Sequence, residues 1–229
     1  MNLRAKSAIL FCSTFLFCFD LEANLDDYYP YKIVPNSSNY GNTGILETPN
    51  ARFMEEASLR FNFSGSFPNE YTALSASPFN WLEASYRYAE IKNRKYGPSA
   101  YSGNQSFKDK GFDIKFKLLS EREYLPSIAL GMRDIAGTGI FSSEYLVSTK
   151  RFQDFDVTLG LGWGILGSDS NIRNPLSSLD DRFLIRNIDS VGQGGDFSFK
   201  SWFSGQTSIL GGIEYDLKKY GLRFKLEYD

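Results

Sequence analysis

The sequence predicts an all-β protein, an antiparallel meander of the kind that forms outer-membrane β-barrels. Two observations lead to this fold class. Apolar and polar residues alternate in five short runs, at 57–63, 82–88, 112–118, 155–163 and 222–228. Turn-forming residues separate several of the runs, and helical periodicity is nowhere convincing. Because successive side chains on a strand point to opposite faces, each run predicts a strand with one apolar and one polar face.

The chain begins with the features of a secretory signal peptide, which we assign to residues 1–23. Arg4 and Lys6 supply positive charge, residues 8–19 are mostly apolar, and Ala23 offers a small residue for cleavage. The apolar part is too short for a stable spanning helix, which takes about 20 residues. We therefore expect an exported chain, with a retained anchor as the alternative.

The two cysteines both lie inside this signal. Once it is removed, the mature chain has no cysteine for a disulfide framework. A lipid-acceptor cysteine follows a small residue, whereas Phe11 precedes Cys12 and Phe17 precedes Cys18. We therefore expect no lipid anchor at either cysteine. No later stretch approaches 18 continuous apolar residues, which leaves periplasm, outer membrane or medium as the location.

Composition excludes several classes of function. The net charge is −2 with mixed signs, so a nucleic-acid partner is not expected. Histidine is absent, which removes Ser-His-Asp hydrolases and zinc peptidases. Aromatic residues make up 16% of the chain, a share that suits half-buried sheets and the interfacial girdles of barrels. Several of them, including Trp81, Trp163 and Tyr215, lie near strand ends, a placement that fits such a girdle.

After the signal we expect two regions. Residues 24–55 form an irregular N-terminal segment that Pro35 and Pro49 interrupt, and residues 56–229 form the barrel domain. The connections at 93–108 and especially 165–205 are long and polar, whereas the others are short, which is typical of outer-membrane barrels. The eight or nine expected strands are 57–64, 70–77, 81–90, 111–119, 126–134, 142–150, 155–164, 206–216 and 221–228.

The polar face of these strands is crowded with charge. In a barrel it lines a wet lumen, and in a soluble sandwich it is the solvated outer face. The predicted lumen-facing charged residues are Arg60, Glu83, Arg87, Asp113, Lys115, Lys117, Arg133, Asp156, Arg223, Lys225 and Glu227. Bases outnumber acids by seven to four in this set, a bias that would favour anionic sugars.

Few motifs point to chemistry. Gly137-Thr138-Gly139 lacks the Lys-Ser/Thr pair and the helix of a phosphate loop, so a tight turn is expected. Arg133-Asp134 is a structural ion pair or a polysaccharide contact, and we favour the structural role. Asp169 and Asp180-Asp181 lack the ligand spacing of a calcium loop. We expect no catalytic residue, no metal and no cofactor.

Four stretches carry a resemblance to a known family. They run from Asn39-Tyr40-Gly41 to Ala51-Arg52, from Pro78 to Glu83 with Arg87-Tyr88, from Lys108 to Gly139 and from Ser143 to Gly164. They resemble the YjbH-like family of exopolysaccharide-biosynthesis proteins, over most of residues 39–229.

The resemblance implies an outer-membrane β-barrel that acts with other exopolysaccharide assembly and export proteins. By implication the chain takes a non-catalytic part in making or exporting a polysaccharide, with membrane lipid and the polymer as partners. Family members are longer and the alternation still runs at Asp229, so we expect the sequence to cover the first barrel region. One alternative is a soluble periplasmic β-sandwich that binds carbohydrate or a partner protein. Another is a glycosidase that uses Glu83 and Glu227.

Overall fold

The computed structural model describes residues 34–187 and 199–228, so the expected signal at 1–23 lies outside the described residues. All nine expected strands are present. Their bounds are β1 Ser58–Ser66, β2 Asn69–Phe79, β3 Leu82–Lys95, β4 Ser106–Leu119, β5 Ser127–Arg133, β6 Ser143–Phe152, β7 Phe155–Gly164, β8 Thr207–Leu217 and β9 Leu222–Tyr228.

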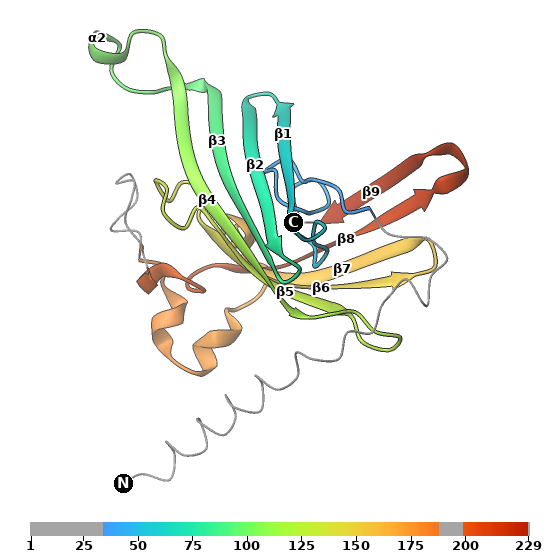
Figure 1. The fold of residues 1–229 in the computed structure, drawn as a ribbon. Coiled ribbons are helices and arrows are strands. Elements are labelled where there is room, and N and C mark those ends of the chain that lie inside the picture. The colour runs from blue at the N-terminus through green and yellow to red at the C-terminus, as the bar shows by residue number, and fades with distance from the viewer. Residues whose placement is uncertain (1–33, 188–198, 229) are drawn as a thin grey trace.

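The strands form one antiparallel meander. Each strand pairs with its neighbours in sequence order, from β1 to β9, and the sheet curls into a half-barrel (Figure 1). Among the described residues β1 pairs only with β2 and β9 only with β8, so these strands do not close a ring. The all-β antiparallel fold is confirmed. A β-sandwich would need a second sheet, and the described residues form a single one.

The connections sort by length onto the two ends of the sheet, because alternate connections of a meander lie at the same end. One end carries 96–105, 134–142 and 165–206, together with the tight turn at 67–68. The other end carries only 80–81, 120–126, 153–154 and 218–221. We refer to these as the long-loop end and the short-turn end. The arrangement matches the long external loops and short periplasmic turns of outer-membrane barrels.

Helical structure is limited to single turns. The described helices are α2 (Ser99–Ser102) and the 3-10 turns η3 (Ile165–Gly167), η4 (Pro175–Ser178), η5 (Asp181–Leu184), η6 (Phe199–Ser201) and η7 (Lys218–Tyr220). Within the described part of the chain, no helix has the length and apolarity needed to span a bilayer.

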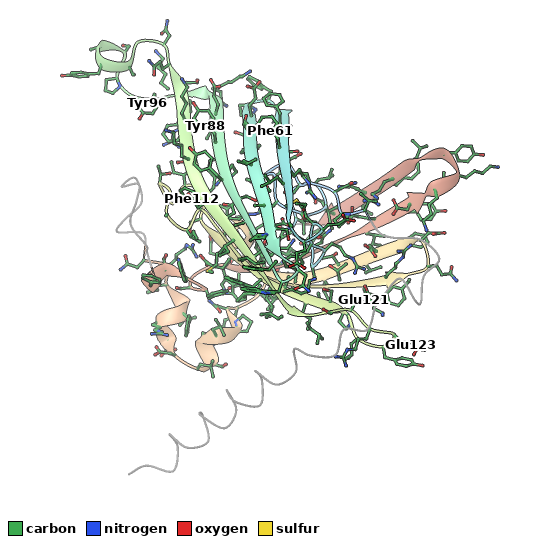
Figure 2. The ribbon with its side chains drawn as sticks, in the orientation of Figure 1. Phe61, Tyr88, Tyr96, Phe112, Glu121 and Glu123 are labelled. Atoms are coloured by element: carbon green, nitrogen blue, oxygen red, sulfur yellow. The ribbon has the colours of Figure 1, made fainter. Side chains whose placement is uncertain are left out.

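The two faces of the sheet are inverted relative to a soluble protein. On β4, Phe112 is 49% exposed, whereas the adjacent Asp113 is 3% exposed and Lys115 only 1%. On β1, Leu59 and Phe61 are more than 70% exposed. Figure 2 marks Phe61 and Phe112 among the side chains of these strands. The concave face is therefore charged and enclosed, and the convex face is apolar and open.

Aromatic rings stack on the convex face near the short-turn end. The Trp81 ring lies 5.4 Å from Phe79 and 6.3 Å from Phe116, measured between centroids. Phe155 at the start of β7 stacks on Tyr215 of β8 at 4.5 Å. The sequence places Trp163 in the same kind of belt, but this residue is only 3% exposed.

Trp163 is buried because the chain returns over it. Its ring meets Phe203 of the long connection edge-on, at 5.3 Å between centroids. The strand pattern around Trp163 gives no sign of this later contact. The expectation of an interfacial Trp163 is therefore wrong.

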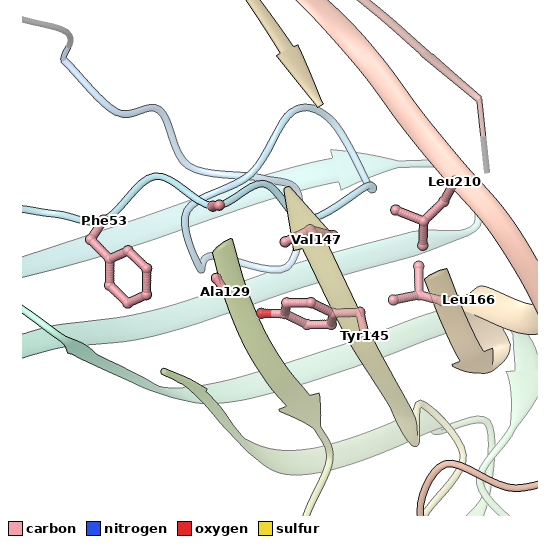
Figure 3. Close-up of a cluster of buried hydrophobic side chains, with 7 residues drawn as sticks. Phe53, Ala129, Tyr145, Val147, Leu166 and Leu210 are labelled. Carbon is pink, nitrogen blue, oxygen red and sulfur yellow. The ribbon is translucent and has the colours of Figure 1, made fainter. Parts of the chain in front are cut away.

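A small apolar core joins the sheet to the N-terminal segment. Ala51 and Phe53 pack with Ala129, Tyr145, Val147, Leu166 and Leu210 (Figure 3). Tyr145 needs Gly131 on the neighbouring strand, because a Cβ added there would lie 2.2 Å from the Tyr145 ring. This cluster fixes one part of the N-terminal segment, and polar contacts fix the remainder.

Candidate functional site: the concave face and the N-terminal segment

The concave face holds the charged residues that the sequence singles out. Six of them are buried, with 9% exposure or less: Glu83, Arg87, Asp113, Lys115, Arg133 and Asp156. Five are half-buried: Arg60, Lys117, Arg223, Lys225 and Glu227. Charges on this face need partners, because an unpaired buried charge is strongly destabilising.

The partner is the N-terminal segment, whose described part, residues 34–55, lies in the hollow of the sheet (blue in Figure 1). At its centre, Glu83 accepts hydrogen bonds from the Thr43 N–H at 2.6 Å and from the Thr43 hydroxyl at 2.7 Å. Lys115 lies opposite Glu83 in the register of β3 and β4. Its ammonium donates to the carbonyls of Thr43, at 3.1 Å, and Arg52, at 2.6 Å. A cross-strand charge pair thus binds both the backbone N–H and the backbone carbonyl of one residue, Thr43.

The last strand binds the segment in the same way. The carboxylate of Glu227 accepts hydrogen bonds from three consecutive backbone N–H groups, those of Leu46, Glu47 and Thr48, at 2.9–3.1 Å. Lys225 donates to the carbonyl of Ile45 at 2.5 Å. Because Glu227 has charge-assisted bonds to several donors, this contact is expected to be strong.

Basic residues on three strands hold further carbonyls of the segment. Arg133 at the end of β5 donates to the backbone carbonyl of Glu47 at 2.8 Å. Arg223 on β9 donates to the carbonyl of Val34 at 2.8 Å, and Arg60 on β1 donates to the carbonyl of Pro35 at 3.3 Å. The segment therefore bridges the first and last strands of the half-barrel.

The segment leaves the hollow through a buried ion cluster at the short-turn end. The guanidinium of Arg52 donates twice to Asp156, at 2.8 and 2.9 Å, and once to Glu121, at 2.5 Å. Glu121 also accepts from the backbone of Arg151, and it lies at the β4–β5 turn (Figure 2). Burial lowers the pKa of Arg52, but Asp156 and Glu121 outweigh it and raise the pKa above its usual value. Sequence reasoning missed Arg52 and Glu121, because neither lies in an alternating run.

These contacts change the interpretation of the predicted charges. Five of the seven bases (Arg60, Lys115, Arg133, Arg223 and Lys225) donate to backbone carbonyls of the N-terminal segment. Each of these bases therefore has at least one donor engaged by the protein itself. The predicted preference for anionic sugars, which rests on a count of free lumen bases, loses its main support.

The long connection is attached elsewhere. Arg186 forms a two-pronged ion pair with Glu144 at the start of β6, with both N···O distances 2.8 Å. It also donates to Ser142 at 2.7 Å and to the carbonyl of Ser201 at 3.0 Å. The described part of 165–205 is thereby bound to the long-loop end of the sheet.

The remaining motifs have structural positions. Gly137-Thr138-Gly139 lies in the β5–β6 connection, where Gly139 has a φ of +79°. The Asp180 side chain accepts from the Arg182 N–H at the start of η5. Glu83 and Glu227, the pair considered for glycoside hydrolysis, both hold backbone N–H groups of the N-terminal segment. In the described ranges, no three His, Cys, Asp or Glu residues converge as a metal site would require.

Comparison with known proteins places the chain in a family. Residues 36–229 match the family described as "Exopolysaccharide biosynthesis protein YbjH". The chain belongs to this family. The matched range contains all nine strands and nearly all of the described N-terminal segment, so both parts of the site lie within it. The resemblance carried by the four sequence stretches is confirmed.

A curated relative extends beyond this chain. "Uncharacterized lipoprotein YjbH" of Escherichia coli (strain K12) is 43% identical over 202 residues, which cover 88% of this chain. The same residues cover 29% of that relative, so the chain spans less than a third of its length. No solved structure shows a significant match to the chain.

Proposed function

We propose that the chain is an outer-membrane protein that takes a non-catalytic part in the assembly or export of an exopolysaccharide. The observation that carries the proposal is the inverted sheet, with apolar side chains outside and paired charges inside. In water this arrangement is unfavourable, because large apolar patches on soluble proteins are rarely left uncovered. In a bilayer the same arrangement is the expected one.

Three further features support a membrane location. The rings near Trp81 and Phe155 lie at one end of the sheet, as the aromatic girdle of a barrel does. Seven of the nine strands have 9–14 residues, enough for a tilted strand to cross the hydrocarbon layer. The long connections share one end, which the proposal places at the cell exterior. Family membership supports the link to exopolysaccharide.

The non-catalytic part of the proposal rests on how the carboxylates are used. Glycoside hydrolysis needs two carboxyl groups free to face one glycosidic bond. Glu83 and Glu227 are instead bound to the backbone of the N-terminal segment. Their role in this proposal is to hold that segment in the hollow.

Fractionation and polymer measurements test the proposal together. The full chain is expected in the outer-membrane fraction and to need detergent for release, and deleting its gene is expected to lower surface polysaccharide. Complementation with Glu83→Gln should restore polymer whenever the protein still assembles, because no catalysis is lost. Release by osmotic shock alone would contradict the membrane location. Purified protein that shortens the polymer, and loses this activity in Glu83→Gln, would contradict the non-catalytic role.

A further inference from the structure

The guanidinium of Arg87 is the least satisfied polar group of the concave face. Arg87 extends from β3 and is fully buried, at 0% exposure. None of its three nitrogens has a hydrogen-bond partner among the described residues. Its closest carboxylate oxygen, Oδ2 of Asp113, lies 3.6 Å from Nε, beyond a good hydrogen bond. Because buried donors are almost always paired, this group points to a partner that is not part of the sheet.

Acceptor atoms without partners lie beside it. Oδ2 of Asp109, Oδ2 of Asp113 and Oδ1 of Asp134 are buried and make no hydrogen bond within the described chain. A Cβ built on Gly111 would lie 2.7 Å from Oδ1 of Asp134 and 2.8 Å from Nη2 of Arg87, so both atoms border the same small volume. Donors and acceptors are therefore gathered at one place.

Aromatic rings form the walls of this place. The ring centroid of Tyr40 lies 4.9 Å from Tyr71 and 6.3 Å from Phe141, and the last two are 5.9 Å apart. The guanidinium of Arg87 lies 4.6 Å from the Phe141 ring and 5.6 Å from the Tyr40 ring. The three rings come from the N-terminal segment, β2 and the β5–β6 connection.

The β5–β6 connection, residues 134–142, covers the cluster at the long-loop end. The Thr138 hydroxyl binds it to the sheet by donating to Asp109 of β4 at 2.7 Å, and the Phe141 N–H closes it on itself by donating to Asp134, its first residue, at 3.1 Å. Gly137 packs so closely that an added Cβ would lie 1.7 Å from Oδ1 of Asp134. A ligand that replaced these two hydrogen bonds would move residues 137–141 of the cover away from Asp109 and Asp134.

We propose that Arg87, Asp109, Asp113 and Asp134, with the rings of Tyr40 and Phe141, form a binding site for a neutral sugar residue beneath this cover. The inference rests on the proposed function and names the chemistry of the polymer unit recognised. A sugar hydroxyl both donates and accepts, as the unpartnered guanidinium and carboxylates require. The apolar face of a pyranose ring packs against aromatic side chains. Because the cluster contains three acids and one base, the site fits a neutral hexose better than a uronate.

The electrostatics of the cover agree with this assignment. Burial first, and then the neighbouring Asp109, raise the pKa of Asp134 to about 6. Arg87 and the Phe141 N–H act in the opposite direction, and Asp113 adds to the rise. Ionisation of Asp134 is therefore less favourable than usual near neutral pH. A hydroxyl that donates a hydrogen bond to the carboxylate would make it more favourable.

Saturation-transfer NMR on the detergent-solubilised full chain tests the site. The probes are the methyl α-glycosides of glucose, galactose and mannose, with glucuronate as the anionic comparison. At least one neutral glycoside is expected to bind, and more strongly than glucuronate. Gly137→Ala, which forces residue 137 of the cover away from the Asp134 carboxylate, is expected to increase the signal. Arg87→Lys is expected to weaken binding about tenfold, because the planar fork is lost.

A variant at an aromatic residue of the site keeps the test valid should Arg87→Lys fail to fold. Phe141→Leu retains an apolar cover without the ring and should also weaken binding. Tyr101→Leu, in the 96–105 connection at the same end and 92% exposed, is the matched control and should not. No signal from any neutral glycoside in both the wild type and Gly137→Ala would overturn the inference, as would equal binding in Phe141→Leu and the wild type. Those results leave the membrane location untouched, which fractionation decides independently.

Discussion

Glu83→Gln is the sharpest perturbation of the contact between sheet and N-terminal segment. The carboxylate accepts from the Thr43 N–H, from the Thr43 hydroxyl and, at 3.3 Å, from the Met54 N–H, with 1% of the residue exposed. Glutamine keeps the shape but replaces one acceptor oxygen with an NH₂ group that faces donors. It also leaves the opposite ammonium of Lys115 without its cross-strand partner.

The size of the effect follows from these contacts. A hydrogen bond to a charged group contributes about 1.5–3 kcal/mol, and an unpaired buried charge adds to the loss. We expect Glu83→Gln to destabilise the fold by about 2–4 kcal/mol. For a chain of this size that lowers the unfolding midpoint by about 5–15 °C. Glu83→Gln combined with Lys115→Met should be less destabilising than the single change, because both charges are then removed.

Limited trypsin digestion measures directly whether the N-terminal segment stays bound in the hollow. Arg52 is 7% exposed and ion-paired, so wild-type protein is expected to resist cleavage there. Glu83→Gln is expected to be cut after Arg52 at lower trypsin concentration. Glu56→Gln changes an exposed carboxylate next to the segment and serves as the control. If Glu83→Gln matched Glu56→Gln in both unfolding midpoint and cleavage, the buried charges would not hold the N-terminal segment in the hollow.

Three further predictions follow from single positions. Leu159→Arg places a charge on the convex face, where the residue is 62% exposed, and should cost about 2–4 kcal/mol of membrane stability, measured as a lower yield of folded protein in the outer membrane. Gly131→Ala drives a methyl group to within 2.2 Å of the Tyr145 ring and should cost about 1–3 kcal/mol, measured by thermal unfolding. Asp134 has a folded pKa of about 6, above its ordinary 3.8. Its contribution to the free energy of unfolding is therefore most favourable below about pH 4 and is lost as pH rises through 6. The loss is at most about 3 kcal/mol. Asp134→Asn should thus match the wild type near pH 4 and be more stable at pH 8.

The first two predictions have control variants, and the third is contradicted by one result. Leu179→Arg, in the long connection and 78% exposed, should leave assembly unchanged. Equal yields of Leu159→Arg and Leu179→Arg would refute the lipid contact of Leu159. Gly65→Ala meets nothing closer than 3.5 Å and should be tolerated, so a similar loss in both glycine variants would refute the Tyr145 contact. A parallel pH profile for Asp134→Asn and the wild type would show that burial does not affect this carboxyl.

The strands and their facing could be predicted because the signal is local. Phe112, Asp113 and Lys115 alternate within one strand, and the period of two fixes which side chains share a face. The open edges at β1 and β9 could not be predicted from the alternation of apolar and polar residues. Alternation marks where a strand lies and which face it presents, but it does not say whether the first and last strands meet.

The role of the N-terminal segment could not be predicted, for a physical reason. Its contacts join backbone groups to side chains far away in sequence, as when the Leu46 N–H donates to Glu227 across 181 positions. Any residue supplies the same backbone N–H, so the segment itself carries no pattern for this binding. The charges on the strands were visible, but their partner was not.

The proposed membrane location depends on which face of the sheet meets lipid, and a spin-label scan along β4 measures this directly. Single cysteines are introduced at positions 112 to 118, with serine at Cys12 and Cys18, and the label is probed in outer-membrane vesicles. We predict high collision with lipid-soluble oxygen at 112, 114, 116 and 118, and low access of oxygen and of a water-soluble nickel complex at 113, 115 and 117. High access of the nickel complex at 112, 114 and 116 would place the apolar face in water and contradict the account.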